Sequence, residues 1–156
     1  MAQLQPGDLA PTFSAMDQTG VEHVLEDHLA SGKRVLLYFY PTDDTPGCTK
    51  QACDFRDAMP EFDANDILVL GVSRQGEASH RKFVAKYDLN FPLLIDEDRT
   101  LHEAYGTWGE KMMYGKVRMG VKRSTFLIET DGTLAEARYN VRASGHVDMI
   151  RRLIGI

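Results

Sequence analysis

The segment RVLLYFYPTDDTPGCTKQACDF, residues 34–55, combines a strand signal, a helix start and the only two cysteines of the chain. Residues 34–40 form a near-continuous apolar run with β-branched and aromatic side chains, which predicts a strand buried on both faces. From Pro46 to about Phe62, apolar residues recur at intervals of three or four, which predicts a helix. A buried strand therefore leads into a helix whose first turn contains Cys48.

The rest of the chain alternates short strands with helices. Residues 12–27 (TFSAMDQTGVEHVLED) predict two short strands around a turn at residues 17–20. After the cysteine segment, the sequence predicts a strand at 67–72, a helix at 77–87, a strand at 91–95, a helix from a cap at Asp98 to about Tyr105, a Gly-rich loop at 106–120, strands at 124–129 and 133–139 around a hairpin turn, and a closing helix at 146–153.

This order of elements predicts an α/β fold: a mixed central sheet with helices on both faces and an N-terminal β-hairpin. The pattern is compatible with a thioredoxin-like architecture, and propensity alone also permits a flavodoxin-like sheet. A length of 156 residues fits a single domain, residues 1–156. A chain of this size can bury a core without disulfides or metals.

Composition excludes several classes of function. The formal net charge of −5 argues against nucleic-acid and anionic-membrane partners, because both need clustered positive charge. Two cysteines are too few for a disulfide-framework scaffold. No signal peptide is evident, and the longest apolar runs are too short to span a bilayer. The expected compartment is the cytoplasm, where a close cysteine pair is more often catalytic or redox-active than structural.

Cys48 is placed where a nucleophile is expected. Thr45 can cap the helix through its hydroxyl, and Pro46 fits the first helical position. Cys48 then falls at the third helical position, close to unpaired backbone N–H groups and the positive end of the helix dipole. Both effects favour thiolate over thiol, and the thiolate is the reactive form. A role in filling the core is the weaker interpretation of this cysteine.

Cys53 cannot reach Cys48 while the helix is intact. Residues five apart on an α-helix are about 140° apart around the axis and roughly 8–9 Å apart at Cα. A disulfide needs a Cα separation below about 7 Å. Any reaction between the two sulfurs therefore requires the first turn or two to unwind. Taken alone, Cys53 is equally well interpreted as a small buried hydrophobe.

A zinc site is disfavoured, because the histidines are scattered with no close ligand pair. Each histidine is interpreted as a solvent-facing or capping residue; they are His23, His28, His80, His102 and His146.

The stretch YFYPTDDTPGCTKQACDFRD resembles the active-site segment of the peroxiredoxins, and more narrowly that of the peroxiredoxin Q group, also called bacterioferritin comigratory proteins. The family pattern is matched by Pro41, Thr45 and Cys48. A second family feature, an arginine opening a late strand, is matched by Arg123 in VKRSTFLIETDG. The resemblance extends over essentially the whole chain. It implies a thioredoxin-like fold.

The resemblance also implies roles for individual residues. Cys48 would attack a peroxide and become a sulfenic acid, and Cys53 would resolve it as a Cys48–Cys53 disulfide. Thr45 would hydrogen-bond thiolate and peroxide, Arg123 would stabilise the developing charge, and Pro41 would shield the pocket. The expected substrates are hydrogen peroxide and alkyl hydroperoxides, and the expected reductant is thioredoxin or a similar dithiol protein. No cofactor is implied, and the subgroup suggests a monomer.

Two other classes of function compete with a peroxidase. A general thiol–disulfide oxidoreductase would favour C-x-x-C, whereas this chain has C-x4-C. A redox-responsive chaperone or sensor without peroxidase turnover would use the same unwinding helix to expose apolar residues such as Phe55.

Overall fold

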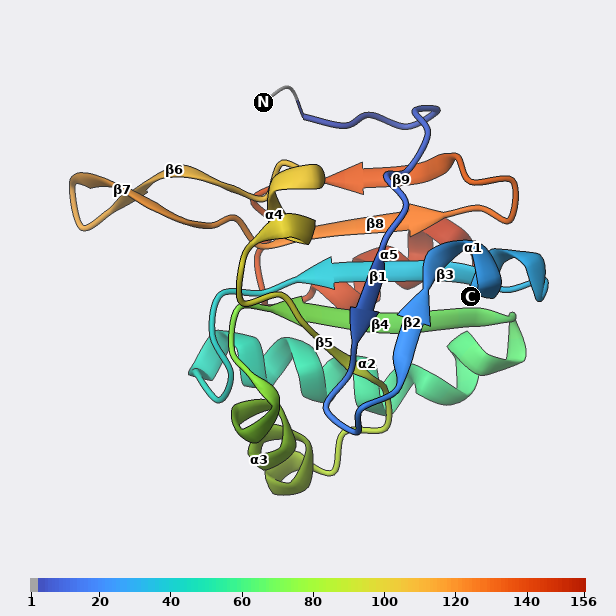
Figure 1. Ribbon diagram of the computed structural model, residues 1–156, viewed down its shortest axis with the longest axis horizontal. Helices are drawn as coiled ribbons and strands as arrows, with labels where there is room; N and C mark the ends of the chain where they lie inside the picture. Colours follow the sequence, from blue (N-terminus) through green and yellow to red (C-terminus); the bar gives the residue numbers. More distant parts are fainter. Residues whose placement is uncertain (1–2) are drawn as a thin grey trace.

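A five-stranded mixed sheet forms the centre of the protein (Figure 1), and the computed structural model describes residues 3–156. The strand order is β5-β4-β3-β8-β9, with β3–β4 and β4–β5 parallel and β3–β8 and β8–β9 antiparallel. The strands are β3 (Arg34–Phe39), β4 (Ile67–Ser73), β5 (Leu93–Ile95), β8 (Ser124–Ile128) and β9 (Leu134–Arg138). The predicted mixed α/β architecture is confirmed.

Helices cover both faces of this sheet (Figure 1). Alternate residues of β3 face opposite sides: Leu36 and Tyr38 pack in the core with α2 and α5, whereas Leu37 and Phe39 pack with α1 and α4. This explains why the apolar run is continuous rather than alternating. The helices are α1 (Leu25–Ala30), α2 (Pro46–Ala64), α3 (Glu77–Tyr87), α4 (Thr100–Ala104) and α5 (His146–Ile154).

Two hairpins lie outside the central sheet. β1 (Ser14–Met16) pairs with β2 (Glu22–Val24), as expected for the N-terminal hairpin, but α1 follows directly where only strand was predicted. β6 (Trp108–Met113) pairs with β7 (Lys116–Val121) and projects from the body of the molecule (Figure 1).

The prediction of a Gly-rich loop at 106–120 was therefore wrong. The turn between β6 and β7 has positive φ at Tyr114 and Gly115, which is the backbone of a tight hairpin turn rather than of an irregular loop. Gly109 and Gly120 face each other across the pair, and the Lys111 side chain lies over Gly120. These glycines leave room for a long side chain on the ribbon.

The cap of α4 also differs from the prediction. The carboxylate of Asp96, not of Asp98, accepts the backbone N–H groups of Leu101 and His102, at 3.0 and 2.8 Å. Asp98 accepts only the N–H of Thr100, at 3.1 Å.

The interpretation of the histidines as solvent-facing or capping residues was wrong for four of the five. His23, His80, His102 and His146 are buried, and His28 is half-buried. The four buried rings are accommodated because each has a polar partner: Asp17, Asp43, Asp96 and Thr125, respectively. Across residues 3–156, no helix is both long and apolar enough to cross a membrane.

Candidate active site

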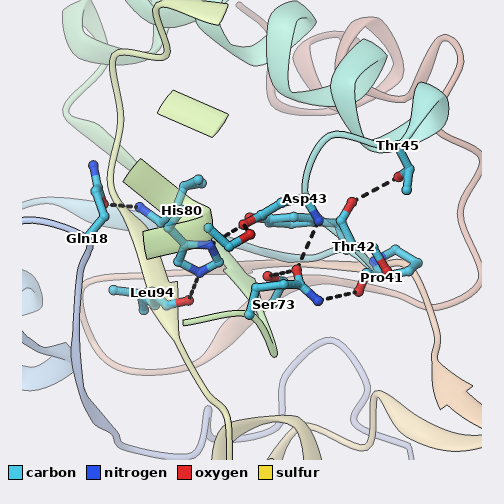
Figure 2. A network of polar contacts seen from close by, with 12 residues as sticks. Gln18, Pro41, Thr42, Asp43, Thr45, Ser73, His80 and Leu94 are labelled. Atoms are coloured by element: carbon cyan, nitrogen blue, oxygen red, sulfur yellow. Dashed lines mark hydrogen bonds and ion pairs between the residues drawn. The ribbon is translucent and has the colours of Figure 1, made fainter. Parts of the chain in front are cut away.

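Cys48 lies at the start of α2, where the chain leaves β3 through the loop at residues 40–45 (Figure 2 shows this loop). Thr45 is the N-cap residue, and Pro46 opens the helix, so Cys48 is at the third helical position, as predicted. Its side chain is only 2% exposed and belongs to the core cluster that contains Tyr38 and Phe55. The thiol is therefore held rigidly at a helix N-terminus.

Arg123 reaches Cys48 from a distant part of the chain. Its Nη2 donates to Cys48 Sγ at 3.3 Å, and its Nη1 donates to Gln51 Oε1 at 2.6 Å. The sheet explains the encounter: Ser124, the first residue of β8, pairs with Phe39, the last residue of β3. Arg123 and the loop before α2 consequently emerge at the same end of the sheet.

Positively polarised groups lie beside the Cys48 sulfur. They are the guanidinium of Arg123 and the unpaired N–H groups of the first turn of α2. Lys111 is a further cation near this cluster: burial lowers its pKa, the positive charge of Arg123 lowers it further, and the charge of Cys48 opposes both effects.

Thr45 does not cap α2 through its side chain, contrary to the prediction. Its hydroxyl donates to the carbonyl oxygen of Thr42 at 2.9 Å (Figure 2). With its hydrogen engaged there, the Thr45 oxygen is left as an acceptor. It can receive a hydrogen bond from an incoming O–H group but cannot donate one to Cys48 in this arrangement.

Pro41 is half-buried at the other end of the same loop. Its carbonyl oxygen accepts a hydrogen bond of 3.4 Å from Gln75 Nε2. Pro41, Thr45 and Cys48 thus lie on one continuous segment, and only Arg123 comes from elsewhere in the fold.

Comparison with known proteins identifies the family. The AhpC/TSA family model matches residues 6–137. The chain belongs to the AhpC/TSA family. It is 43% identical over 150 residues to peroxiredoxin Bcp of Escherichia coli, covering 96% of this chain and 95% of that protein. It is a peroxiredoxin of the Bcp, or peroxiredoxin Q, kind.

Solved structures agree in fold. The bacterioferritin comigratory protein of Xanthomonas campestris, described for its alkyl peroxide reduction activity, has a TM-score of 0.85 and 38% identity, with 92% of this chain and 90% of that one covered. A mutant of the Xylella fastidiosa PrxQ has a TM-score of 0.90 and 32% identity, with 99% and 98% covered. The expected thioredoxin-like fold is confirmed.

Cys53 lies further along the same helix of this peroxiredoxin. It is half-buried, and neither cysteine is in a disulfide. α2 runs unbroken from Pro46 to Ala64, so the two cysteines point about 140° apart around its axis. The geometry is that of a reduced site with two separate thiols.

Several residues at the site were missed from the sequence. Gln51 is fully buried and accepts a hydrogen bond from Arg123. The sequence feature that could have revealed it is a polar residue one turn after Cys48 on an apolar helix face. Tyr38 is also fully buried, and its hydroxyl has no hydrogen-bond partner among residues 3–156. Burial, and then the charge of Cys48, raise the pKa of Tyr38 well above its usual value.

Phe39, Tyr40 and Trp108 differ in their surroundings. Phe39 and Tyr40 are buried in the core, whereas Trp108 is half-buried, with the guanidinium groups of Arg74 and Arg99 each 4.7 Å from its ring centre. No cluster of three or more potential metal-ligating His, Cys, Asp or Glu side chains occurs in the described part of the chain.

Proposed function

We propose that Cys48 of this peroxidase attacks the terminal oxygen of hydrogen peroxide or an alkyl hydroperoxide. The S–O bond forms as the O–O bond breaks, Cys48 is oxidised to a sulfenic acid, and the leaving oxygen takes a proton and departs as water or an alcohol. Alkyl peroxide reduction is described for the Xanthomonas relative, which supports this substrate class.

The remaining site residues act on the charge and the position of the peroxide. Arg123, which already contacts Sγ, stabilises the thiolate and the charge that develops as the O–O bond breaks. The Thr45 oxygen accepts the hydrogen bond of the peroxide O–H, because its own hydrogen is given to Thr42. Pro41 donates no hydrogen bond and shields the pocket from water.

Cys53 then resolves the sulfenic acid. Its sulfur attacks Cys48, the S–S bond forms, and the sulfenic oxygen leaves as water. The intact α2 holds the two side chains apart, so this step requires its first turns to unwind. A dithiol protein such as thioredoxin reduces the disulfide by exchange and returns both thiols. The protein works as a cytoplasmic monomer and needs no cofactor, because the two cysteines carry the electrons.

The contact between Arg123 Nη2 and Cys48 Sγ carries this proposal. A fixed cation 3.3 Å from a buried sulfur at a helix N-terminus has no evident structural purpose, but it is the environment that a nucleophilic thiolate needs. A general disulfide oxidoreductase would instead place its two sulfurs within reach of each other, which α2 prevents.

A coupled assay tests the assignment. With thioredoxin, its reductase and NADPH, the wild-type chain is expected to consume peroxide continuously, and Cys48→Ser is expected to lose all turnover. Cys53→Ser is the matched control, because it makes the same replacement of sulfur by oxygen on the same helix. We expect it to perform a single turnover and then stop. Undiminished turnover in Cys48→Ser would eliminate the proposal.

A further inference from the structure

Asp43 is an acidic residue at the centre of the active-site loop, yet it is buried (Figure 2). Its carboxylate accepts hydrogen bonds from Tyr40 Oη at 2.6 Å and Ser79 Oγ at 2.7 Å. The third partner is His80, whose Nδ1 lies 2.6 Å from Asp43 Oδ2. A buried carboxylate is tolerated only with such a set of partners, and the loop carries no other acid that is buried in this way.

His80 is fully buried and connects the loop to the sheet. Its Nε2 lies 2.9 Å from the carbonyl oxygen of Leu94 in β5. A carbonyl only accepts, so Nε2 carries a hydrogen. Burial raises the pKa of Asp43, but the hydrogen bonds from His80 and Tyr40 outweigh it and lower the pKa overall. Asp43 is then a carboxylate, and one of its oxygens faces Nδ1 of His80.

Gln75 forms two further hydrogen bonds with the backbone of the same loop, at Asp43 and at Pro41. Its Oε1 accepts the backbone N–H of Asp43 at 2.9 Å and the hydroxyl of Ser73 at 2.7 Å. Its Nε2 donates to the carbonyl oxygen of Pro41. The loop is therefore attached to β4, β5 and α3.

We propose that Asp43 and His80 are positioning residues for the peroxide step, because they hold the loop in the shape that presents Pro41 and Thr45 to the substrate. The chain of contacts is continuous: His80 fixes Asp43, the neighbouring Thr42 carbonyl fixes the Thr45 hydroxyl, and that oxygen is left to accept from the peroxide. The inference rests on the proposed role of Cys48. It does not extend to the disulfide step, in which α2 unwinds beyond this loop.

Two substitutions of His80 separate this role from a merely structural one. The amide nitrogen of Asn is as many bonds from Cα as Nδ1, and that of Gln is as many as Nε2. His80→Asn can therefore keep the bond to Asp43 and lose Leu94, whereas His80→Gln can keep Leu94 and lose Asp43. If His80 only anchors α3 to β5, His80→Asn should be the more damaging substitution. If His80 orders the loop, His80→Gln should be the more damaging one.

Single-turnover mixing with peroxide measures the oxidation of Cys48 and the closure of the disulfide separately. We expect His80→Gln to slow oxidation about tenfold, because small misplacements of a reacting group are costly, while closure is unchanged. His80→Asn is expected to stay within about threefold of the wild type in both steps. Equal oxidation rates in wild type and His80→Gln, or a slower His80→Asn than His80→Gln, would overturn the proposal.

Substitutions of Asp43 give the same test if the His80 variants do not fold. In Asp43→Asn the amide oxygen can accept from Tyr40, and the amide group can keep a hydrogen bond to Nδ1 of His80, so oxidation should stay within about threefold of the wild type. Asp43→Ala leaves Tyr40, Ser79 and His80 without their carboxylate partner, and oxidation should slow about tenfold. Equal rates in the two variants would overturn the proposal.

Cys48→Ser distinguishes the two levels of interpretation. If that variant still consumes peroxide, the proposed function fails whatever the His80 variants do. If it is inactive while His80→Gln oxidises as fast as the wild type, only the positioning role fails.

Discussion

At Cys48, a buried sulfur lies beside a cation. The side chain is 2% exposed, and the Arg123 guanidinium contacts its sulfur at the N-terminus of α2. Apart from the family resemblance, nothing in the sequence is a reason to distinguish Arg123 from its neighbour Lys122. The sheet register supplies the reason, since it brings the start of β8 against the end of β3.

Replacing Arg123 by Gln tests the proposed role of this contact. If the guanidinium stabilises both the thiolate and the charge that develops on the peroxide, as proposed, Arg123→Gln should reduce the rate of Cys48 oxidation by roughly 10²–10³-fold. Stopped-flow mixing with peroxide measures that rate. Lys122→Gln removes a neighbouring charge that does not contact Cys48 and should leave the rate unchanged. Similar losses in the two variants would show that general charge, not the contact, is responsible.

Gly47 tests how closely the guanidinium is positioned. A Cβ at this residue would lie 3.3 Å from Arg123 Nη2, so the guanidinium must shift by a few tenths of an ångström. Gly47→Ala should slow peroxide oxidation several-fold. Its free energy of unfolding should not fall, because alanine is favoured in helices by up to about 1 kcal/mol. A rate equal to that of the wild type would show that the contact tolerates displacement.

The histidines show where inference from single residues fails. Their spacing disfavoured zinc ligation, but nothing local indicated burial, because their partners Asp43, Asp96 and Thr125 are recognised only once the chain is folded. Gln51 was missed for the same reason, since its partner is 72 residues away.

At the scale of the element, the proposed cycle makes two conflicting demands on α2. The helix is folded to place Cys48 at its N-terminus, and in the proposed cycle it unwinds to let Cys53 approach. The sequence predicted this helix well, because Thr45-Pro46 marks its start and the apolar spacing is regular. The β6–β7 hairpin was missed, because its glycines signal a loop unless the cross-strand pairing is known.

Hydrogen exchange tests the unwinding of α2. Oxidation to the disulfide should accelerate exchange of backbone amides between Thr49 and about Asp57, while the amides of β3 and β4 remain protected. Mass spectrometry of the reduced and the oxidised protein measures the difference. Exchange that is equally slow in both states would contradict a disulfide that requires unwinding.

Cys53→Ser tests resolution on the same helix. Without the second sulfur, the sulfenic acid on Cys48 has no partner within the chain, so it should accumulate after one turnover and over-oxidise to sulfinic acid more readily than in the wild type. The masses of the peptides that contain Cys48 report both products. The absence of any oxygen adduct in this variant would remove the resolving role of Cys53.

At the scale of the whole molecule, β3 explains why the site is rigid. Its two faces contribute to separate cores, one with α2 and α5 and one with α1 and α4, and the strand is paired on both edges. The sequence predicted this doubly buried strand from one continuous apolar run. It did not predict the antiparallel placement of β8 beside β3, because strand order depends on long-range pairing.

His146 links the stability of the fold to pH. Burial, and then the charges of Arg123 and Arg138, lower the pKa of His146 from 6.5 to about 4. In the unfolded chain, His146 therefore binds a proton near pH 6.5, whereas in the folded chain it binds one only near pH 4. Stability should fall as the pH drops from about 6.5 to about 4, by roughly 3 kcal/mol from this residue.

Urea titrations across that range measure the slope. His146→Gln can keep a hydrogen bond to Thr125 and has no proton to bind, so its stability should depend less on pH between those values. The same slope in variant and wild type would assign the acid sensitivity to other groups.

The intact mass of the chain after one equivalent of hydrogen peroxide, measured without reductant, tests the central claim most directly. We expect the wild type to lose two hydrogens as the Cys48–Cys53 disulfide closes, Cys53→Ser to gain one oxygen, and Cys48→Ser to be unchanged. An unchanged mass for the wild type, or oxidation that persists in Cys48→Ser, would contradict the account.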